Sequence, residues 1–484
     1  MTHSDDRPEV FRRSPLSESD LDQIHAQAMR ILENVGTEVD SEAMLRMLAE
    51  AGQRVEGSRV RWDAGFVMEQ LAKAPGQFTL QGRDPQHTVT IGGGSLVHVP
   101  TGGAPFVDDA VRGRRDGDIA AHIELVKMAH ASGILPVLQS GTVEAQDLSD
   151  LSRHLEMDYS IARWSGRPYI LYGATGPRTR DGLALAAIAA GGEEALLRQP
   201  GVMGIVNPNS PLVWDNLMVE ELMALAEFGQ PVAITPFLLA GASAPVTLAG
   251  GLSLLVAETL TGVAMAQLVR PGAPCILGTF LNGVDMRSGG PSLGLPESTL
   301  GTLAGSQLAR RYGLPLRGGG GLCSGLDLDA QTATESAMSL WATYLAECDL
   351  VVHAAGWLEG GLVASYEKFA LDVEVIQMFE RLRAGIAVNE SQLAYDVIEE
   401  LGPGGLFLAH EHTLEHFRTE SFMSPMFRSQ AYPTWVKLGS PSVASVATSQ
   451  WQKLLEQYED PGIDDAVDAE LRAFVDRRSA ELDD

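Results

Sequence analysis

The sequence predicts an α/β protein, a (β/α)8 TIM barrel with helical N- and C-terminal extensions. Short apolar runs recur along the chain, with starts about 30 to 43 residues apart. Helical patterns separate them, for example over residues 212–228 and 252–268. The 484 residues are 45% hydrophobic and 20% charged, which suffices for a large core. Strands alternating with helices at this spacing are typical of a parallel sheet.

The first part of the chain predicts helices over residues 17–75. Ser17 or Ser19 is placed to cap the first of them. Its apolar stripe recurs at helical spacing, and residues 41–51 repeat the pattern. We expect residues 1–85 to form a helical extension that packs beside the main domain.

Seven strand-like runs follow, and an eighth strand is expected in their flanks. They are ILPVL at 134, PYILY at 168, VMGIV at 202, PVAITP at 231, PCILGT at 274, LPLRGGG at 314 and LVVHAAG at 350. Eight such units predict a closed barrel over residues 86–435. A doubly wound open sheet is the alternative, but the first strand is not followed by G-x-G-x-x-G. Helical spacing returns at 393–401 and 446–458, and residues 436–484 are predicted as a C-terminal helical extension.

Composition and charge exclude some classes of binding partner and indicate the cellular compartment. A net charge of −28 opposes binding to nucleic acid and to anionic membranes. The three cysteines show no C-x-x-C spacing, which favours a reducing compartment and hence the cytoplasm. The N-terminus has no secretory signal pattern, and charges and prolines interrupt the most apolar stretch, 237–280. We expect a homo-oligomer, because terminal helical extensions suit a symmetric interface.

Polar residues at strand ends are the first candidates for a site, because barrel enzymes place their chemistry there. Arg317 ends one run and His353 ends the next. An arginine presents a planar fork that grips a carboxylate at two points. Alone, the arginine is more simply explained as a tether for a loop and the histidine as a hydrogen-bonded core residue, whereas the pair on neighbouring strands favours a site. Thr279, Phe280, Tyr172 and Asn207 also follow strands.

The stretch HAAGWLEGGLVASYEKFALD, which starts at His353, combines aromatic rings with carboxylates. Rings and negative charge are what a quaternary ammonium group needs, since it has no N–H to donate. Packing against the barrel exterior is the alternative for Trp357 and Tyr366. Glu258 lies in the apolar helix VAETLTGVAMAQL, where a carboxylate is usually paired or functional. The Gly- and Pro-rich loop 280–297 predicts a cover over the barrel mouth.

Two further motifs do not by themselves predict a site. The run RGGGGLCSG lacks the G-K-[ST] ending of a nucleotide-binding loop, and Cys323 within it is either a buried cysteine or part of the site. His412 and His416 share a helical face beside His410, but H-E-x-x-H is absent, so no metal site is predicted.

The chain resembles the trimethylamine methyltransferase family, specifically its members without pyrrolysine. The motifs that carry the resemblance are GRDPQHTV at 82, FVDDAVRGRR at 106, SPLVWDNLM at 210, GASAPVTLAG at 241, AETLTGVAMAQLVRPGAP at 257, VDMRSGGPSLGLPE at 284, LDAQT at 328, HAAGWLEGGLVASYEKFALD at 353, GPGGLFLAHEHTLEHFR at 402 and YEDPGID at 458. The resemblance implies a (β/α)8 barrel that transfers a methyl group from a methylated amine to the cobalt of a separate corrinoid protein. Pyrrolysine is absent here, so it implies a quaternary amine, glycine betaine or a related betaine, in place of trimethylamine.

This chemistry needs positioning more than acid or base catalysis. A quaternary ammonium methyl group is already activated, because its amine leaves as a neutral molecule, and Co(I) comes from the partner. We therefore predict no catalytic acid or base, and no cofactor bound by this chain. Arg317 and His353 are expected to grip a substrate carboxylate. The residues expected to surround the ammonium group are Trp357, Tyr366 and Glu258, with Phe106 as a further wall.

Two other functions stay open at this point. The barrel would also suit a betaine methyltransferase or lyase that uses a folate or thiol acceptor. It would also suit a non-catalytic betaine-binding protein. The sequence holds no D-x-H-x-x-G string for cobalamin, so a corrinoid has to come from a partner. Which betaine is used is not specified by these motifs.

Overall fold

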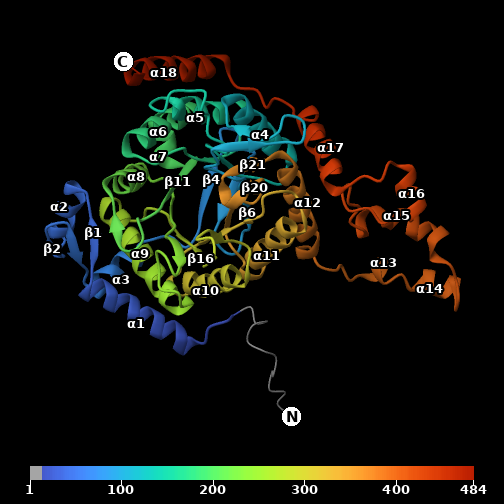
Figure 1. Cartoon of the computed structure of the whole chain (residues 1–484), viewed down its shortest axis with the longest axis horizontal. Helices are drawn as coiled ribbons and strands as arrows, with labels where there is room; N and C mark the ends of the chain where they lie inside the picture. Colours follow the sequence, from blue (N-terminus) through green and yellow to red (C-terminus); the bar gives the residue numbers. More distant parts are fainter. Residues whose placement is uncertain (1–13, 484) are drawn as a thin grey trace, which may run out of the picture.

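An eight-stranded parallel sheet forms the centre of the protein in a computed structural model that describes residues 14–483 (Figure 1). The N-terminal residues, where no secretory signal is predicted, lie outside the described part. In spatial order the strands are β6 (Val97–His98), β19 (Leu350–Val352), β18 (Leu316–Gly319), β15 (Cys275–Gly278), β13 (Val232–Ile234), β11 (Val202–Val206), β10 (Tyr169–Ile170) and β9 (Leu138–Gln139).

The ring closes beyond the ends of β6 and β9. Ala104 forms a parallel bridge with Val143, and the Gly103 amide donates to the Gly141 carbonyl at 2.7 Å. The predicted barrel is thereby confirmed, and each of the seven predicted runs overlaps one of its strands. The eighth strand is β6, in the N-terminal flank of those runs.

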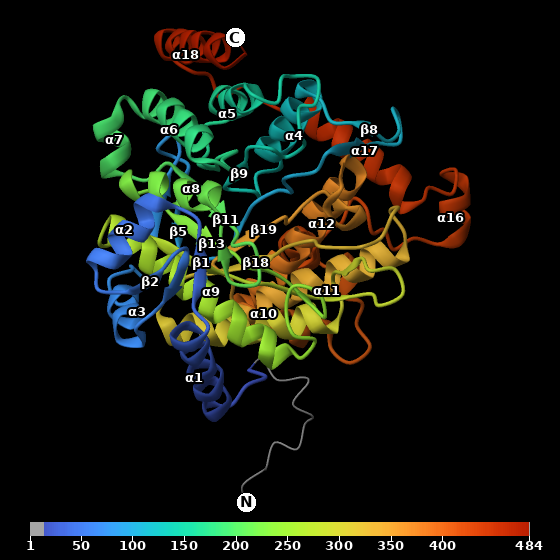
Figure 2. The same ribbon diagram turned by 60° about the vertical axis from the view of Figure 1, so that its left-hand side comes forward.

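Each barrel strand is followed by a helix on the outside of the ring (Figure 2). These helices are α4 (Ile119–Ser132), α5 (Arg153–Trp164), α6 (Gly176–Ala190) with the short α7 (Glu193–Arg198), α8 (Asn216–Glu227), α9 (Leu248–Val269), α10 (Pro296–Tyr312), α11 (Ala330–Ala346) and α12 (Tyr366–Arg383). Most begin at a residue whose side chain accepts a backbone N–H, such as Asp118, Thr175 and Asp215.

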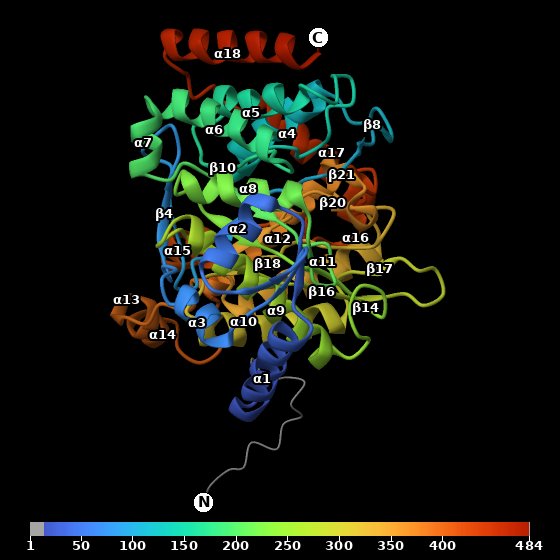
Figure 3. The ribbon, with the colours of Figure 1, turned by 90° about the vertical axis from the view of Figure 1, so that its left-hand side faces the viewer.

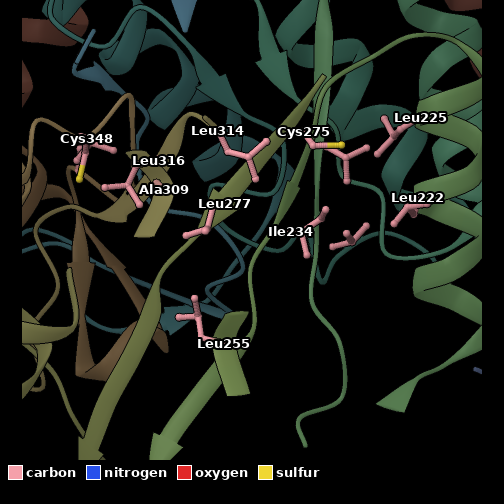
Figure 4. Close-up of a cluster of buried hydrophobic side chains, with 14 of the residues drawn as sticks. Leu222, Leu225, Ile234, Leu255, Cys275, Leu277, Ala309, Leu314, Leu316 and Cys348 are labelled. Carbon is pink, nitrogen blue, oxygen red and sulfur yellow. The ribbon is translucent and has the colours of Figure 1, made fainter. Parts of the chain in front are cut away.

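Two apolar layers hold the ring together, as the alternation of side chains along a strand requires. On β15, Ile276 points into the barrel, where it packs with Val352 and Met203. Its neighbours Cys275 and Leu277 point outward to the larger layer beneath the helices, which Figure 4 shows. The hairpin of β4 (Phe78–Gln81) and β5 (Thr88–Ile91) adds Leu80 and Ile91 to the inner layer and so closes the amino end of the barrel.

Among the described helices, only α9 is long and apolar enough for a membrane span, and 89% of its most apolar window is buried inside the molecule. It packs against α1, α3 and α8, as a core helix does. Its apolar character therefore has an explanation within the barrel.

The N-terminal segment contains strands as well as the predicted helices. Its helices are α1 (Glu18–Asn34), α2 (Glu42–Glu50) and α3 (Ala64–Leu71), and Ser17 caps α1 as predicted. Between them β1 (Thr37–Val39), β2 (Arg54–Glu56) and β3 (Arg59–Arg61) form a small sheet with β12 (Val213–Trp214). Strands of two or three residues are too short to show a period in the sequence, which is why they were not predicted.

Two small sheets surround the mouth of the barrel, at the carboxyl ends of its strands. One contains β7 (Phe106–Asp108), β8 (Arg115–Asp116), β20 (Trp357–Leu358) and β21 (Val363–Ser365), with the 3-10 turn η2 (Glu359–Gly361). The other contains β14 (Phe237–Ala240), β16 (Phe280–Val284) and β17 (Pro291–Ser292). The loop predicted to cover the mouth thus contains the β16–β17 hairpin.

The chain ends in a projecting segment and two long helices. After α12 come α13 (Glu390–Leu393), α14 (Tyr395–Leu401), η3 (Phe407–Ala409), α15 (Glu411–Glu420) and α16 (Tyr432–Lys437). Helix α17 (Val443–Glu456) then packs on α12 and α4, and α18 (Asp465–Asp483) packs on α5 and α6. The division into a barrel at 86–435 and two extensions stays a prediction, while barrel strands and helices run from Val97 to Arg383.

Candidate active site at the barrel mouth

A cavity of about 460 Å³ lies at the carboxyl ends of the barrel strands. Residues within or just after all eight strands line it, which is the usual place for the site of a barrel enzyme. They include Gly103, Gln139, Glu144, Tyr172, Asn207, Glu221, Thr235, Phe237, Phe280, Arg317, His353 and Trp357. Of the strand-end candidates, Thr279 alone is not part of this lining.

Arg317 is a buried cation that faces the cavity without an anionic partner. Its side chain is 2% exposed, and one Nη donates to the Thr279 carbonyl at 3.4 Å. Its Nε has no hydrogen-bond partner, and no carboxylate within residues 14–483 pairs with it. Burial lowers its pKa to about 10, so it remains charged at neutral pH. A buried charge left unpaired is costly, and an anionic ligand group would remove that cost.

His353 directly follows β19, the strand that pairs with the β18 strand of Arg317. Burial and the nearby guanidinium hold its pKa well below the usual range, so the imidazole is neutral. Its Nδ1 has no partner within the described chain, and its backbone adopts a φ of +62°.

The glycine run in RGGGGLCSG has a structural explanation, because a Cβ at Gly320 would lie 2.3 Å from the Ala354 Cα. That run therefore brings two strand ends together and does not form a phosphate loop.

Aromatic rings form one wall of the cavity. The Trp357 ring centroid lies 4.4 Å from that of His353, and its Nε1 donates to the Cys323 carbonyl at 3.2 Å. Phe237 and Phe280 stack at 4.6 Å across the mouth. Phe106 packs with Trp357 and Phe280 behind the wall but does not line the cavity.

Two carboxylates line the cavity that sequence reasoning missed. Glu144 accepts a hydrogen bond from the Tyr172 hydroxyl at 2.6 Å. Glu221, on α8, is buried and accepts one from the Ala174 amide at 2.8 Å. Burial raises the pKa of Glu221 to about 8. The signal that singled out Glu258, a carboxylate within an apolar helix, is present at Glu221 as well.

Glu258 and Tyr366 are not part of the cavity, in contrast to the predicted ligand contacts. Glu258 accepts hydrogen bonds from the Ser210 hydroxyl at 2.7 Å and the Leu212 amide at 2.6 Å, so it anchors the loop before α8. The Tyr366 hydroxyl donates to Glu124, and its ring contacts Trp451 at 5.0 Å. Both residues are buried, as their setting in the sequence suggested, but they face neighbouring elements instead of the barrel mouth.

Cys323 and the histidines of α15 lie outside the cavity as well. Cys323 is buried with its thiol directed to the Trp357 carbonyl at 3.1 Å. His412 and His416 face each other on α15 with ring centroids 4.4 Å apart. Within the described part of the chain there is no group of three or more His, Cys, Asp or Glu side chains suited to a metal ion.

Several buried polar atoms of the cavity have no partner within residues 14–483. They include Gln139 Oε1, Thr235 Oγ1, Arg317 Nε and His353 Nδ1. Buried polar groups in native proteins are nearly always hydrogen-bonded, so a concentration of unpaired ones in one cavity indicates a ligand site. The arrangement offers hydrogen bonds and one positive charge at Arg317, and aromatic rings and carboxylates on other walls.

Fold and cavity define a (β/α)8-barrel enzyme with a small-ligand site at the barrel mouth. The model of the trimethylamine methyltransferase (MTTB) family matches residues 6–483. The chain therefore belongs to the trimethylamine methyltransferase family, and it is a methyltransferase.

Individual relatives agree with that assignment. The chain is 38% identical to the glycine betaine methyltransferase of Desulfitobacterium hafniense over 467 residues, 96% of this chain and 97% of the relative. It is 29% identical to the proline betaine:corrinoid methyltransferase of Eubacterium limosum, covering 86% and 87%. Among solved structures, the Methanosarcina barkeri monomethylamine methyltransferase superposes with a TM-score of 0.51 at 13% identity, covering 92% of this chain and 95% of that one, and supports the fold.

Proposed function

We propose that this enzyme transfers a methyl group from a quaternary amine bearing a carboxylate, glycine betaine or a related betaine, to the Co(I) of a separate corrinoid protein. The observation that carries the proposal is the buried, unpaired guanidinium of Arg317 in a cavity whose other walls are aromatic and acidic. A betaine is a zwitterion, and the cavity provides a positive group for its carboxylate and a suitable surface for its cation.

The anionic end of the ligand is assigned to Arg317 and His353. Arg317 lies in β18 and His353 directly follows the neighbouring β19, and each has a buried nitrogen without a partner in the described chain. Charge-assisted hydrogen bonds from a guanidinium to a carboxylate are short and strong. A neutral imidazole can donate from one nitrogen beside it without adding a second charge.

The cationic end is assigned to the rings of Trp357, Phe237 and Phe280 and to the carboxylates of Glu144 and Glu221. Ring faces attract a quaternary ammonium group by about 1–2 kcal/mol each when it is desolvated. Ionised Glu221 would add a favourable charge, and a bound cation would lower the pKa of that carboxyl from its raised value.

The residues of this chain contribute binding, orientation and exclusion of water. The leaving amine departs neutral, so no side chain has to give it a proton. Reduced cobalt supplies a strong nucleophile on the partner protein. The cavity opens at the barrel mouth, where a group held by another protein can reach the ligand. Holding the methyl group in line with that group converts a bimolecular step into an effectively unimolecular one.

A transfer assay tests the proposal directly. The purified chain is mixed with a corrinoid protein reduced to Co(I) and with glycine betaine, proline betaine, carnitine, choline or trimethylamine, and the corrinoid spectrum and the demethylated amine are followed. We expect product with a betaine and none with trimethylamine. Betaine binding by calorimetry without product for any amine would contradict the corrinoid acceptor, and a folate or thiol acceptor would be tested next.

We propose the cytoplasm as the cellular location. All three cysteines are free and buried, which suits a reducing cytoplasm. Fractionation of cells that produce the protein at its native level tests this location, and recovery from a membrane or extracellular fraction would contradict it.

A further inference from the structure

The segment between α12 and α17, residues 384–441, projects from the barrel and is called the arm. Figure 1 shows it at the right, with α13 and α14 farthest from the body. Within these residues, all of them described, Met426 alone is buried. Helix α15 packs chiefly on η3, which belongs to the same arm. The arm therefore packs little against the barrel.

The arm presents apolar side chains to water. Fifteen large apolar residues between 384 and 441 are exposed, and Ile386, Leu406 and Leu408 are 90%, 70% and 75% exposed. Soluble monomers rarely expose contiguous apolar patches beyond a few hundred Å², and larger ones mark interaction sites. The composition of the arm thus indicates a surface that is covered in the working protein.

A groove with an aromatic wall lies at the root of the arm. It encloses about 430 Å³ between α11 and α12, and Trp341, Tyr344, Phe379 and Leu382 line it. Phe379 contacts both Trp341 and Tyr344, with ring centroids 5.5 and 4.8 Å away. Trp341 and Leu382 remain exposed at the edge, so the arm of the same chain leaves this groove uncovered.

The groove lies far from the ligand cavity, so the corrinoid protein is not the partner that best suits it. Leu96, which lines the groove, directly precedes β6, so the groove is at the amino end of the barrel. The ligand cavity is at the carboxyl end. In Figure 3, α13 and α14 lie on one side of the barrel and β14 and β17 of the mouth lie on the other. A protein that reaches the ligand at the mouth would dock away from this surface.

We propose that the arm reaches a second copy of this chain and places its apolar side chains in the Trp341 groove of that copy. Each copy carries both the arm and the groove, so two copies related by a two-fold axis would satisfy both pairs at once. A stable interface buries about 1,600 Å² in total. Two exchanged arms with fifteen exposed apolar residues each offer a contact of that class.

Sedimentation of the full chain at micromolar concentration tests the assembly. Three variants are compared with it: Leu406→Asp/Leu408→Asp in the arm, Trp341→Asp in the groove, and Leu326→Asp as a control. Leu326 is 76% exposed in the loop after β18 and belongs to neither surface. We expect two or more copies for the parent chain and the control, and dissociation constants raised by roughly 100-fold for the arm and groove variants. A monomeric parent chain would overturn the proposal, as would arm and groove variants that assemble normally.

Mixing the arm variant with the groove variant tests the arm-to-groove contact itself. The intact arm of the groove variant fits the intact groove of the arm variant, so the mixture should regain assembled species that neither forms alone. No regained assembly from two folded variants, judged by circular dichroism, would overturn this arrangement. Should an Asp variant fail to fold, the Ser versions at the same positions replace it. If an arm variant assembles like the parent chain but no longer binds the corrinoid protein, the arm binds that partner. This outcome would also overturn the proposal.

Discussion

Lys368 and Asp372 form a fully buried ion pair one turn apart on α12, with Nζ and a carboxylate oxygen 2.6 Å apart. The pair also joins the two loops that carry the proposed anion site. Lys368 donates to the Gly321 carbonyl at 3.1 Å, and Asp372 accepts from the Gly356 amide at 2.9 Å. These loops follow the strands of Arg317 and His353, so the pair holds both strand ends in register.

Removing one member of this pair should destabilise the protein strongly. Asp372→Ala leaves the Lys368 ammonium buried without a counter-charge, which costs about 3–5 kcal/mol. The double variant Lys368→Met/Asp372→Leu leaves no charge behind and should cost less than the single one. Urea unfolding monitored by circular dichroism measures both. Equal losses for the single and the double variant would show that packing, and not charge, determines the effect.

Arg317→Ala should weaken betaine binding while leaving a cation without a carboxylate unaffected. The lost charge-assisted hydrogen bonds are worth about 1.5–3 kcal/mol, or roughly 10- to 100-fold in Kd. Arg317→Lys should recover part of the loss, since an ammonium keeps the charge but not the planar fork. Calorimetry with glycine betaine and with choline separates the two ends of the ligand. If choline binding falls as much as betaine binding, Arg317 supports the cavity and does not bind the carboxylate.

Much of the barrel was predictable because its strands are buried on both faces. Runs such as VMGIV and PCILGT are continuously apolar, and each contains its strand, β11 or β15. The strand β6 lies in LVHV, where His98 interrupts the apolar residues, and it gave no comparable run. Arg317 and His353 were found for a related reason, because a polar residue that ends an apolar run lies at the barrel mouth by topology.

The direction of helical side chains was not predictable in the same way. Helix α9 is buried on all sides, so no polar face indicates where Glu258 points. It faces the loop before α8, whereas Glu221 on α8 reaches the cavity because Gly173 and Gly204 leave space for its carboxylate. Those contacts join residues far apart in the chain, and a single sequence does not record them.

Trp357→Leu should weaken betaine binding more than binding of an isostere that lacks the cation. In 3,3-dimethylbutanoate a carbon replaces the ammonium nitrogen, so shape and carboxylate are kept while the cation is lost. Loss of the ring removes about 1–2 kcal/mol of cation–π attraction, up to roughly 30-fold in Kd, for the betaine only. Trp357→Phe keeps a ring but not the hydrogen bond to Cys323, so it is the matched control. Equal losses for both ligands would assign Trp357 a packing role.

Betaine affinity should rise with pH as Glu221 ionises. Its pKa is raised to about 8 by burial, and a bound cation favours the charged form, so affinity gains up to about tenfold per pH unit below 8. Binding at pH 7 should therefore release a proton, which calorimetry in buffers of different ionisation enthalpy detects. Glu221→Gln should abolish both the proton release and the pH dependence.

Glu221 should also make the stability of the fold depend on pH, and Glu258 provides the control. A pKa raised in the folded state means that the stabilising contribution of Glu221 is fully present below about pH 4.5 and is lost as pH rises towards 8, by at most about 1.4 kcal/mol per unit. The pKa of Glu258 is likewise raised by burial, to about 7, but this residue does not line the cavity. Glu258→Gln should thus change the pH profile of unfolding and leave the pH dependence of betaine binding intact. Loss of that dependence in Glu258→Gln would place the cation beside Glu258, and retention in Glu221→Gln would remove Glu221 from the site.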